Sequence, residues 1–172
     1  MNMKKKETVF LTQAAMIAAI YVVLTFIANA FGLANYAIQV RFSEALTILP
    51  YFTPAAIPGL FIGCLLSNLL TGCALPDIVF GTLATLLGAL GTYALHRWKW
   101  CAPITPILSN AIIVPLVLIY GYGMTIEGVS TAYCYGYYFL TVGAGEIISC
   151  GVLGMILLLS LEKYRTRLFP AL

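Results

Sequence analysis

Five long apolar segments, separated by short polar loops, run along the chain. They cover residues 8–30, 57–70, 78–95, 104–122 and 137–161. Within them lies a single charged residue, Glu146. A helix needs about 20 apolar residues to cross the hydrocarbon core of a bilayer. The pattern therefore predicts an all-α integral membrane protein whose helices span the bilayer.

A sixth apolar segment, at residues 43–52, is too short to cross a bilayer alone. Pro50 lies inside it, and Pro54 and Pro58 follow it closely. Proline ends helices because it lacks a backbone donor and clashes with the preceding turn. At helical rise the segment is about 15 Å long. We expect a short or broken helix that its neighbours bury, or a re-entrant segment.

Positive charge decides whether the short segment counts as a crossing. All but one of the 9 Lys and Arg residues fall in three clusters: Lys4–Lys6, Arg97 with Lys99, and Lys163 with Arg165 and Arg167. Loops rich in Lys and Arg stay in the cytoplasm. Six crossings place all three clusters there, whereas five would put the last two outside. The sequence thus predicts six transmembrane helices in the cell membrane, the second one short, with both termini cytoplasmic.

Composition supports this class of protein and excludes others. Of the 172 residues, 62% are apolar and 9% are charged, and the mean hydropathy is +0.98. Soluble domains carry about 25% charged residues, which excludes a soluble enzyme, a nucleic-acid-binding domain and a disordered chain. The chain has no linker or clear internal repeat, so residues 1–172 are expected to form one transmembrane domain.

Two alternatives concern the N-terminus and the cysteines. Lys4–Lys6, the first apolar segment and residues 28–30 (ANA) resemble a cleavable secretory signal, although a signal core is usually only about 7–15 residues long. Cys73 and Cys134 lie in predicted outer loops and could form a disulfide. Because the 5 cysteines include no CxxC motif, we expect them to be small packing residues.

Glu146 is the sharpest functional candidate. It lies about ten residues, or about 15 Å, into the last predicted helix. An ionised acid at that depth costs about 2.5–3.5 kcal/mol on insertion scales, so a ligand, a partner charge or a proton must compensate. We expect ligand contact, and the alternative is a hydrogen-bonded carboxyl that holds helices together.

Further polar residues lie in the outer half of the predicted bundle. Arg41 and Glu44 share one face of the short helix, either for a ligand or as an intrahelical ion pair. Asp77 follows Pro76 at a helix start, where an acid also complements the helix dipole. Asn68 could bind a ligand or bridge helices. Asn110, farther inward, is expected to serve in packing.

These residues predict a pocket that opens to the outside. Tyr36 and Gln39 precede the short helix on the same side, and several tyrosines add rings there. Interfacial tyrosines usually form an aromatic belt, but rings also stack on planar ligands. Carboxylates, an amide and rings together suit a flat, nitrogen-rich molecule.

Small residues on the first helix suggest close helix contact, and nothing suggests catalysis. Ala14 and Ala18 form one AxxxA pair, and Ala15 and Ala19 form another, for packing inside the chain or docking to another subunit. The single histidine, His96, lies in a cytoplasmic loop, without an HExxH motif or a phosphate loop in the chain. We expect neither an enzyme nor a bound metal or cofactor.

Several motifs resemble the QueT family of queuosine-precursor transporters. The resemblance rests on residues 37–46 (AIQVRFSEAL), 49–52 (LPYF), 56–64 (AIPGLFIGC) with Asn68, and 77–85 (DIVFGTLAT). It implies a substrate-binding S component of an energy-coupling factor (ECF) transporter, with six helices and a ligand site near the outer face. Such a component works with a transmembrane T subunit and two cytosolic ATPase subunits, which use the ATP.

The resemblance also implies a substrate and a docking surface. The substrate would be a 7-deazaguanine such as preQ1, preQ0 or queuine. The AxxxA surface of the first helix would dock on the T subunit. From depth and chemistry, we expect Glu146, Glu44 and Asn68 to hold the ligand, Asp77 to contribute, and Gln39 and Arg41 to lie in or under a covering loop.

Other classes of membrane protein stay open at this stage. One is a stand-alone secondary transporter or channel for a small nitrogenous solute, with Glu146 as a proton or ion site. Another is an S component for a different vitamin or nucleobase. A third is a structural subunit in which the polar residues only lock helices together.

Overall fold

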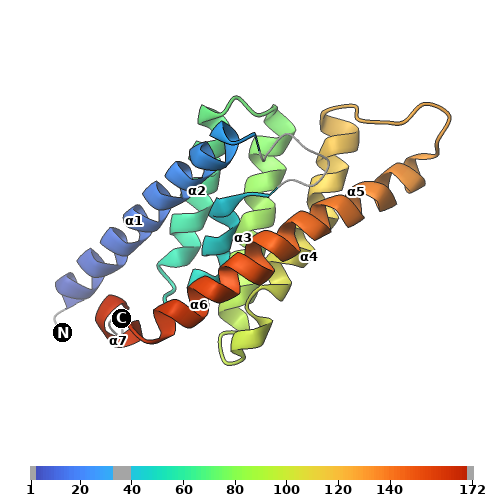
Figure 1. The fold of residues 1–172 in the computed structure, drawn as a ribbon. Helices are drawn as coiled ribbons and strands as arrows, with labels where there is room; N and C mark the ends of the chain where they lie inside the picture. Colours follow the sequence, from blue (N-terminus) through green and yellow to red (C-terminus); the bar gives the residue numbers. More distant parts are fainter. Residues whose placement is uncertain (1–2, 33–39, 170–172) are drawn as a thin grey trace.

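The computed structural model describes residues 3–32 and 40–169, and in these residues all regular structure is helical (Figure 1). Four stretches are long and apolar enough to cross a membrane: Met3–Ala30, Asp77–Ala94, Lys99–Gly121 and Thr131–Glu162. Helix α2 (Ala56–Leu70) is apolar but shorter. The all-α membrane class is therefore confirmed, while the count of six crossings and the orientation of the termini remain predictions.

We call the four membrane-length helical stretches rods. The first is α1 (Met3–Ala30) alone, and the other three combine regular α-helix with wider or tighter turns. These three are η2 (Asp77–Gly81) with α3 (Thr82–Ala94); η3 (Lys99–Cys101) with α4 (Ile104–Leu116) and η4 (Val117–Gly121); and α5 (Thr131–Glu146) with η5 (Ile147–Gly154) and α6 (Met155–Glu162). A short α7 (Arg165–Leu168) follows. The turns of η2, η4 and η5 have π geometry, a distortion that is frequent at functional sites.

The last rod begins earlier than the apolar pattern predicted. Its α5 starts at Thr131 rather than near residue 137 because Ser130 caps it, with the Ser130 hydroxyl accepting from the backbone N–H of Tyr133 at 3.4 Å. Residues 131–136 therefore belong to the helix and not to the preceding loop. Because α5 has 16 residues and the rod has 32, Glu146 lies at the middle of the rod.

The short proline-bracketed segment forms η1 (Phe42–Tyr51), a 3₁₀ helix at the centre of the molecule. Its residues from Ser43 to Tyr51 are all buried. Ile48 is fully buried in a core that also holds Leu60 of α2 and Leu158 of α6. The segment is thus a short helix that its neighbours bury, one of the two forms that its length predicted.

Helices α1 and α2 lie so close together that Gly59 and Gly63 of α2 have no room for a side chain. A Cβ atom added at Gly59 would lie 2.7 Å from the carbonyl oxygen of Ala14. One added at Gly63 would lie 2.8 Å from Cβ of Tyr21 and 3.1 Å from Cα of Ala18. Ala14 and Ala18 are accordingly buried inside the chain.

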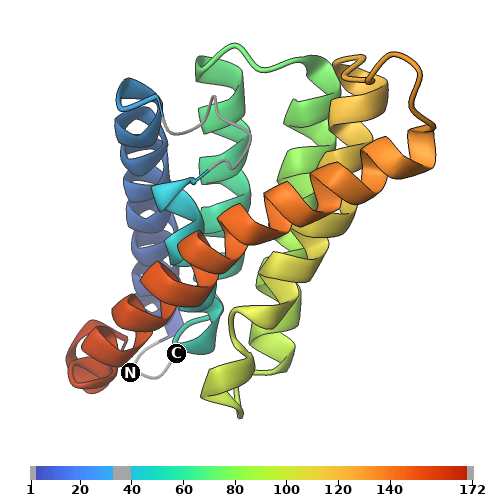
Figure 2. The same ribbon diagram turned by 45° about the vertical axis from the view of Figure 1, so that its right-hand side comes forward.

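The three basic clusters gather at one end of the bundle, which we call the basic end (Figure 2). The start of α1, the loop between α3 and α4, and α7 all lie there. Lys99 Nζ lies 3.3 Å from Oε2 of Glu162, and Gln13 Nε2 donates to the carbonyl oxygen of Leu168 at 3.1 Å. These contacts join η3 to α6 and α1 to α7.

Candidate functional site

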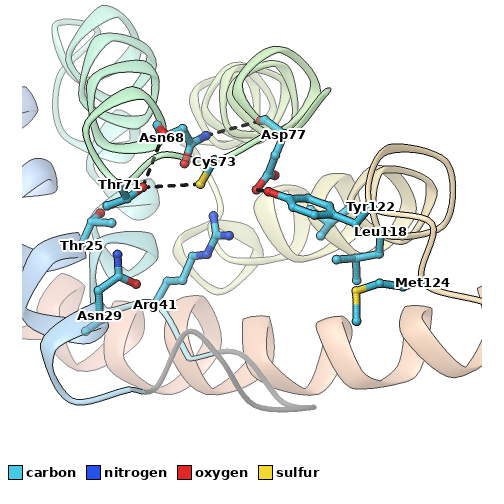
Figure 3. Close-up of a pocket in the computed structure, with 12 residues that line it drawn as sticks. Thr25, Asn29, Arg41, Asn68, Thr71, Cys73, Asp77, Leu118, Tyr122 and Met124 are labelled. Carbon is cyan, nitrogen blue, oxygen red and sulfur yellow. Dashed lines mark hydrogen bonds between the residues drawn. The ribbon is translucent and has the colours of Figure 1, made fainter. Parts of the chain in front are cut away.

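A cavity of about 510 Å³ lies at the end of the bundle opposite the basic end (Figure 3). Sites for small ligands usually measure about 300–1,000 Å³. The walls come from the ends of α1 and α2, the loop from α2 to the start of η2, the last turn of α4, η4 with the residues after it, and the residue that precedes η1. The lining residues are Thr25, Ala28, Asn29, Arg41, Asn68, Thr71, Cys73, Asp77, Val114, Leu118, Tyr122 and Met124.

The Asp77 carboxylate stands on one wall of this cavity. The Tyr122 hydroxyl donates to Oδ2 of Asp77 at 3.2 Å and accepts from the backbone N–H of Ala74 at 3.0 Å. Asn68 Nδ2 donates to the backbone carbonyl of Asp77 at 3.4 Å. A Cβ atom at Gly81 would lie 3.0 Å from Oδ1 of Asp77, so the absence of a side chain there makes room for the carboxylate.

The Tyr122 hydroxyl is suited to act as a donor. Burial raises the pKa of the Tyr122 phenol, and the negative charge of Asp77 raises that pKa further. The phenol therefore keeps its proton and donates it to the carboxylate across the physiological pH range. Sequence reasoning placed Tyr122 only among the interfacial tyrosines, because the pairing with Asp77 joins two rods.

Arg41 enters the cavity from the opposite side (Figure 3). Its backbone is extended, and its N–H donates to Oγ of Ser149 at 3.2 Å, which fixes the residue against η5. Within residues 3–32 and 40–169, Lys99 with Glu162 is the sole ion pair at 4.0 Å or less. Arg41 and Asp77 therefore present opposite charges to the same space without pairing with each other.

A second group of polar side chains lies deeper, and we call it the inner acidic cluster: Tyr21, Glu44, Asn110, Glu146 and Cys150. All five are buried. The Tyr21 hydroxyl donates to Oε1 of Glu44. The Cys150 thiol lies 3.0 Å from Oε2 of Glu146 and 3.4 Å from the backbone carbonyl of Glu44. The cluster thus links α1, η1, α4 and the last rod.

The inner acidic cluster lies one helical turn below the cavity wall on two elements. Glu44 follows Arg41 by three residues, and Asn110 precedes Val114 by four. A carboxyl oxygen of Glu44, one of Glu146 and the Cys150 sulfur lie within 4.8 Å of one another. Two carboxylates and a thiol could hold a metal ion, and the carboxylates alone suit an organic cation. The expectation of no metal remains a prediction.

The structure divides the predicted site residues into groups. Arg41, Asn68 and Asp77 line the cavity, whereas Glu44 and Glu146 belong to the inner acidic cluster. The proposed intrahelical ion pair of Arg41 with Glu44 is absent from the described ion pairs. Tyr36 and Gln39 lie outside the described residues.

The structure also adds residues that the sequence did not single out as site residues. Thr25, Asn29 and Met124 line the cavity, and Tyr21 holds Glu44. Tyr21 is the single tyrosine of the first apolar segment, and one tyrosine among apolar residues does not indicate a partner on another element. Asn110, expected to serve in packing, is buried on α4 beside both carboxyls.

The alanine pairs of α1 face in two directions. Ala14 and Ala18 pack against α2 and are unavailable to another subunit, whereas Ala15 and Ala19 are exposed. They share the exposed surface with large apolar residues such as Leu11, Met16 and Val23. Of the two AxxxA pairs, the structure therefore leaves Ala15 and Ala19 at the surface.

Comparison with known proteins places the chain in a family. One curated relative, the queuosine precursor transporter QueT of Lactococcus lactis subsp. cremoris (strain MG1363), is 35% identical over 98 residues, which are 56% of this chain and 57% of the relative. The match therefore spans little more than half of either protein. No solved structure matches the chain. The profile of the QueT transporter family matches residues 11–163, most of the sequence. The chain therefore belongs to the QueT transporter family.

Proposed function

We propose that this chain captures a 7-deazaguanine precursor of queuosine and serves as the S component of an ECF-type uptake transporter. The family membership and the name of the Lactococcus relative support the substrate class. The Asp77 carboxylate of the cavity and the Glu44 and Glu146 carboxyls below it, together with Arg41, would supply the polar contacts that such a base needs.

The observation that carries the proposal is the placement of Arg41 and Asp77 across one cavity. The guanine-like edge of a 7-deazaguanine offers adjacent N–H donors, which a carboxylate accepts, and a neighbouring carbonyl oxygen, which a guanidinium binds. Asp77 would accept from the N–H edge and Arg41 would donate to the carbonyl oxygen. Leu118 and Met124 would cover the apolar faces of the ring system.

Charge placement supports entry from outside the cell. If the basic end faces the cytoplasm, as the positive-inside rule predicts, the cavity opens toward the exterior. A ligand would enter there, and release to the cytoplasm would need a reorientation of the chain. Because the sequence has no phosphate loop, we assign ATP hydrolysis to two cytosolic ATPase subunits and coupling to a transmembrane T subunit.

Calorimetric titration of the purified chain in detergent tests the substrate. The ligands are preQ1, preQ0, queuine and guanine, with riboflavin and biotin as controls. We expect tight binding of at least one deazaguanine and none of the control vitamins. If folded protein binds no deazaguanine, the proposed substrate class is wrong. Binding of a control vitamin would indicate an S component of another specificity.

The docking surface has its own test. Ala15→Leu places a bulky side chain on the exposed small-residue surface, so uptake in a host with T and ATPase subunits should fall at least tenfold while calorimetric affinity is unchanged. Ala132→Leu makes the same change at an exposed alanine of another helix, α5, and serves as the matched control. Equal uptake by the Ala15 variant and the unmodified chain would remove this surface from the docking proposal.

A stand-alone secondary transporter is the second candidate, and the buried acidic pair of Glu44 and Glu146 favours it. Intramembrane carboxyls often relay protons or bind coupling ions. Purified chain in proteoliposomes, with an imposed proton or sodium gradient and no other subunit, should then accumulate preQ1. The S-component proposal expects no such accumulation until the partner subunits are added.

A further inference from the structure

The inner acidic cluster holds two buried carboxyls, and the charge of Arg41 acts on both of them from the cavity without forming a direct ion pair. Glu44 is 2% exposed and Glu146 is 8% exposed, and they lie at the centre of the bundle. Neither carboxylate belongs to an ion pair of 4.0 Å or less in the part of the chain that the structure describes. Two ionised carboxylates at this depth would each cost several kcal/mol without a counter-charge.

Two buried polar atoms of the cluster have no hydrogen-bond partner among the described residues. They are Oε2 of Glu44 and Nδ2 of Asn110. Asn110 is 4% exposed and lies on α4 beside both carboxyls. Buried polar atoms are nearly always paired. Because Oε2 of Glu44 can only accept a hydrogen bond from a neutral or cationic group, it points to a donor as its missing partner.

We propose that the inner acidic cluster binds the primary ammonium group of a cationic ligand whose ring system lies in the cavity. This inference rests on the proposed function and narrows it, because it selects precursors with an aminomethyl substituent over neutral ones. Glu44 and Glu146 accept hydrogen bonds from the ammonium, and Tyr21 and Cys150 hold the two carboxylates in place.

The distances in the cluster fit an ammonium nitrogen between the carboxylates. Charge-assisted N–H···O bonds are about 2.7–2.9 Å long, so two of them span carboxyl oxygens up to about 5.6 Å apart. The carboxyl oxygens of Glu44 and Glu146 lie within 4.8 Å of each other. One nitrogen can therefore reach both.

The position of the cluster fits a substituent rather than a separate ligand. Arg41 and Val114 line the cavity, and Glu44 and Asn110 lie one turn below them. A ring bound between Arg41 and Asp77 would thus direct one short substituent toward the carboxylates. An aminomethyl group would supply the direct cationic partner that the two carboxyls do not have among the described residues.

The test compares two ligands that differ in this substituent. Titration calorimetry measures preQ1, which carries an aminomethyl group, and preQ0, which carries a neutral nitrile. The unmodified chain should bind preQ1 at least tenfold more tightly. Glu146→Gln should bring the two affinities within threefold of each other by weakening preQ1 alone. Glu127→Gln, in the exposed loop before α5, should leave both unchanged.

The outcomes separate this inference from the proposed function. Binding of neither ligand by folded protein would overturn the proposed function. Equal affinity for both ligands in the unmodified chain, or an equal loss of both in Glu146→Gln, would overturn the ammonium site and leave the substrate class standing.

A metal ion or a structural role would give different results. Stoichiometric metal in the purified chain, measured by inductively coupled plasma mass spectrometry and lost in Glu146→Gln, would also overturn the ammonium site. Glu44→Gln provides a second variant if Glu146→Gln does not fold, and thermal melting in detergent checks the folding of each.

Discussion

The cavity and the inner acidic cluster are both polar, but they differ in what surrounds them. Asp77 is 7% exposed, much like Glu146 at 8%, but its carboxylate lines the cavity and accepts from Tyr122. Among the described residues, the carboxyls of Glu44 and Glu146 accept hydrogen bonds from the buried side chains of Tyr21 and Cys150. A charge near water keeps part of its solvation, whereas a buried one depends on its partners. The cavity is therefore suited to hold the ring of a ligand, and the cluster to discriminate by charge.

Substitution of Asp77 should have the largest effect on ligand binding, and it should not distinguish between ligands. Hydrogen bonds to charged groups contribute about 1.5–3 kcal/mol, so Asp77→Asn should weaken preQ1 and preQ0 alike, by about 10- to 100-fold. Calorimetry measures both affinities. Glu127→Gln removes an exposed acid from the same side of the bundle and should change neither. A loss of affinity for preQ1 alone would mean that Asp77, and not the inner acidic cluster, recognises the charge of the ligand.

A change between α1 and α2 should damage the cluster more than the cavity. Gly63→Ala places Cβ 2.8 Å from Cβ of Tyr21, so α1 must shift and carry the Tyr21 hydroxyl away from Glu44. Such overpacking costs about 1–3 kcal/mol of stability, and the thermal melting temperature in detergent should fall. The preference for preQ1 over preQ0 should shrink at the same time.

Gly136→Ala is the matched control for this change. Both glycines are helical, but no atom lies within 4 Å of a Cβ at Gly136. Alanine favours a helix by about 1 kcal/mol over glycine, so this variant should melt at the same or a higher temperature. Equal melting temperatures of Gly63→Ala and Gly136→Ala would mean that α1 and α2 can separate enough for the added methyl group without a loss of stability.

Removal of one neutral hydrogen bond should have the smallest effect. Tyr122→Phe keeps the ring at the cavity wall and removes the donor to Asp77. A hydrogen bond of this kind contributes about 0.5–1.5 kcal/mol, so both ligands should weaken by about two- to tenfold. Calorimetry with both ligands checks this. A larger loss for preQ1 than for preQ0 would show that Tyr122 also affects the inner acidic cluster.

Much of the fold could be predicted from the sequence, because apolar length sets helix length in a bilayer. The predicted segment 57–70 corresponds to α2 (Ala56–Leu70), and 78–95 corresponds to η2 with α3 (Asp77–Ala94). The start of α5 was the exception. Residues 131–136 (TAYCYG) are neither strongly apolar nor charged, and the capping hydrogen bond of Ser130 decided the boundary.

The candidate site could be predicted only in part. Arg41, Asn68 and Asp77 are polar residues in apolar surroundings, and the structure places all three at the cavity. The separation of Glu44 and Glu146 from that cavity could not be predicted. The depth of a residue along its own helix does not tell which residues of the neighbouring helices it contacts. Ala14 and Ala15 show the same limit, since one faces α2 and the other faces outward.

The sequence by itself determined the membrane class, the helical segments and the polar residues that needed an explanation, because each depends on the local transfer of side chains into an apolar medium. Only the tertiary structure decided which of these residues meet. Tyr21, Glu44, Asn110 and Cys150 are far apart in the sequence and come together because η1 lies buried between α1 and the last rod. A buried charge acts through its neighbours in space, and packing alone supplies those.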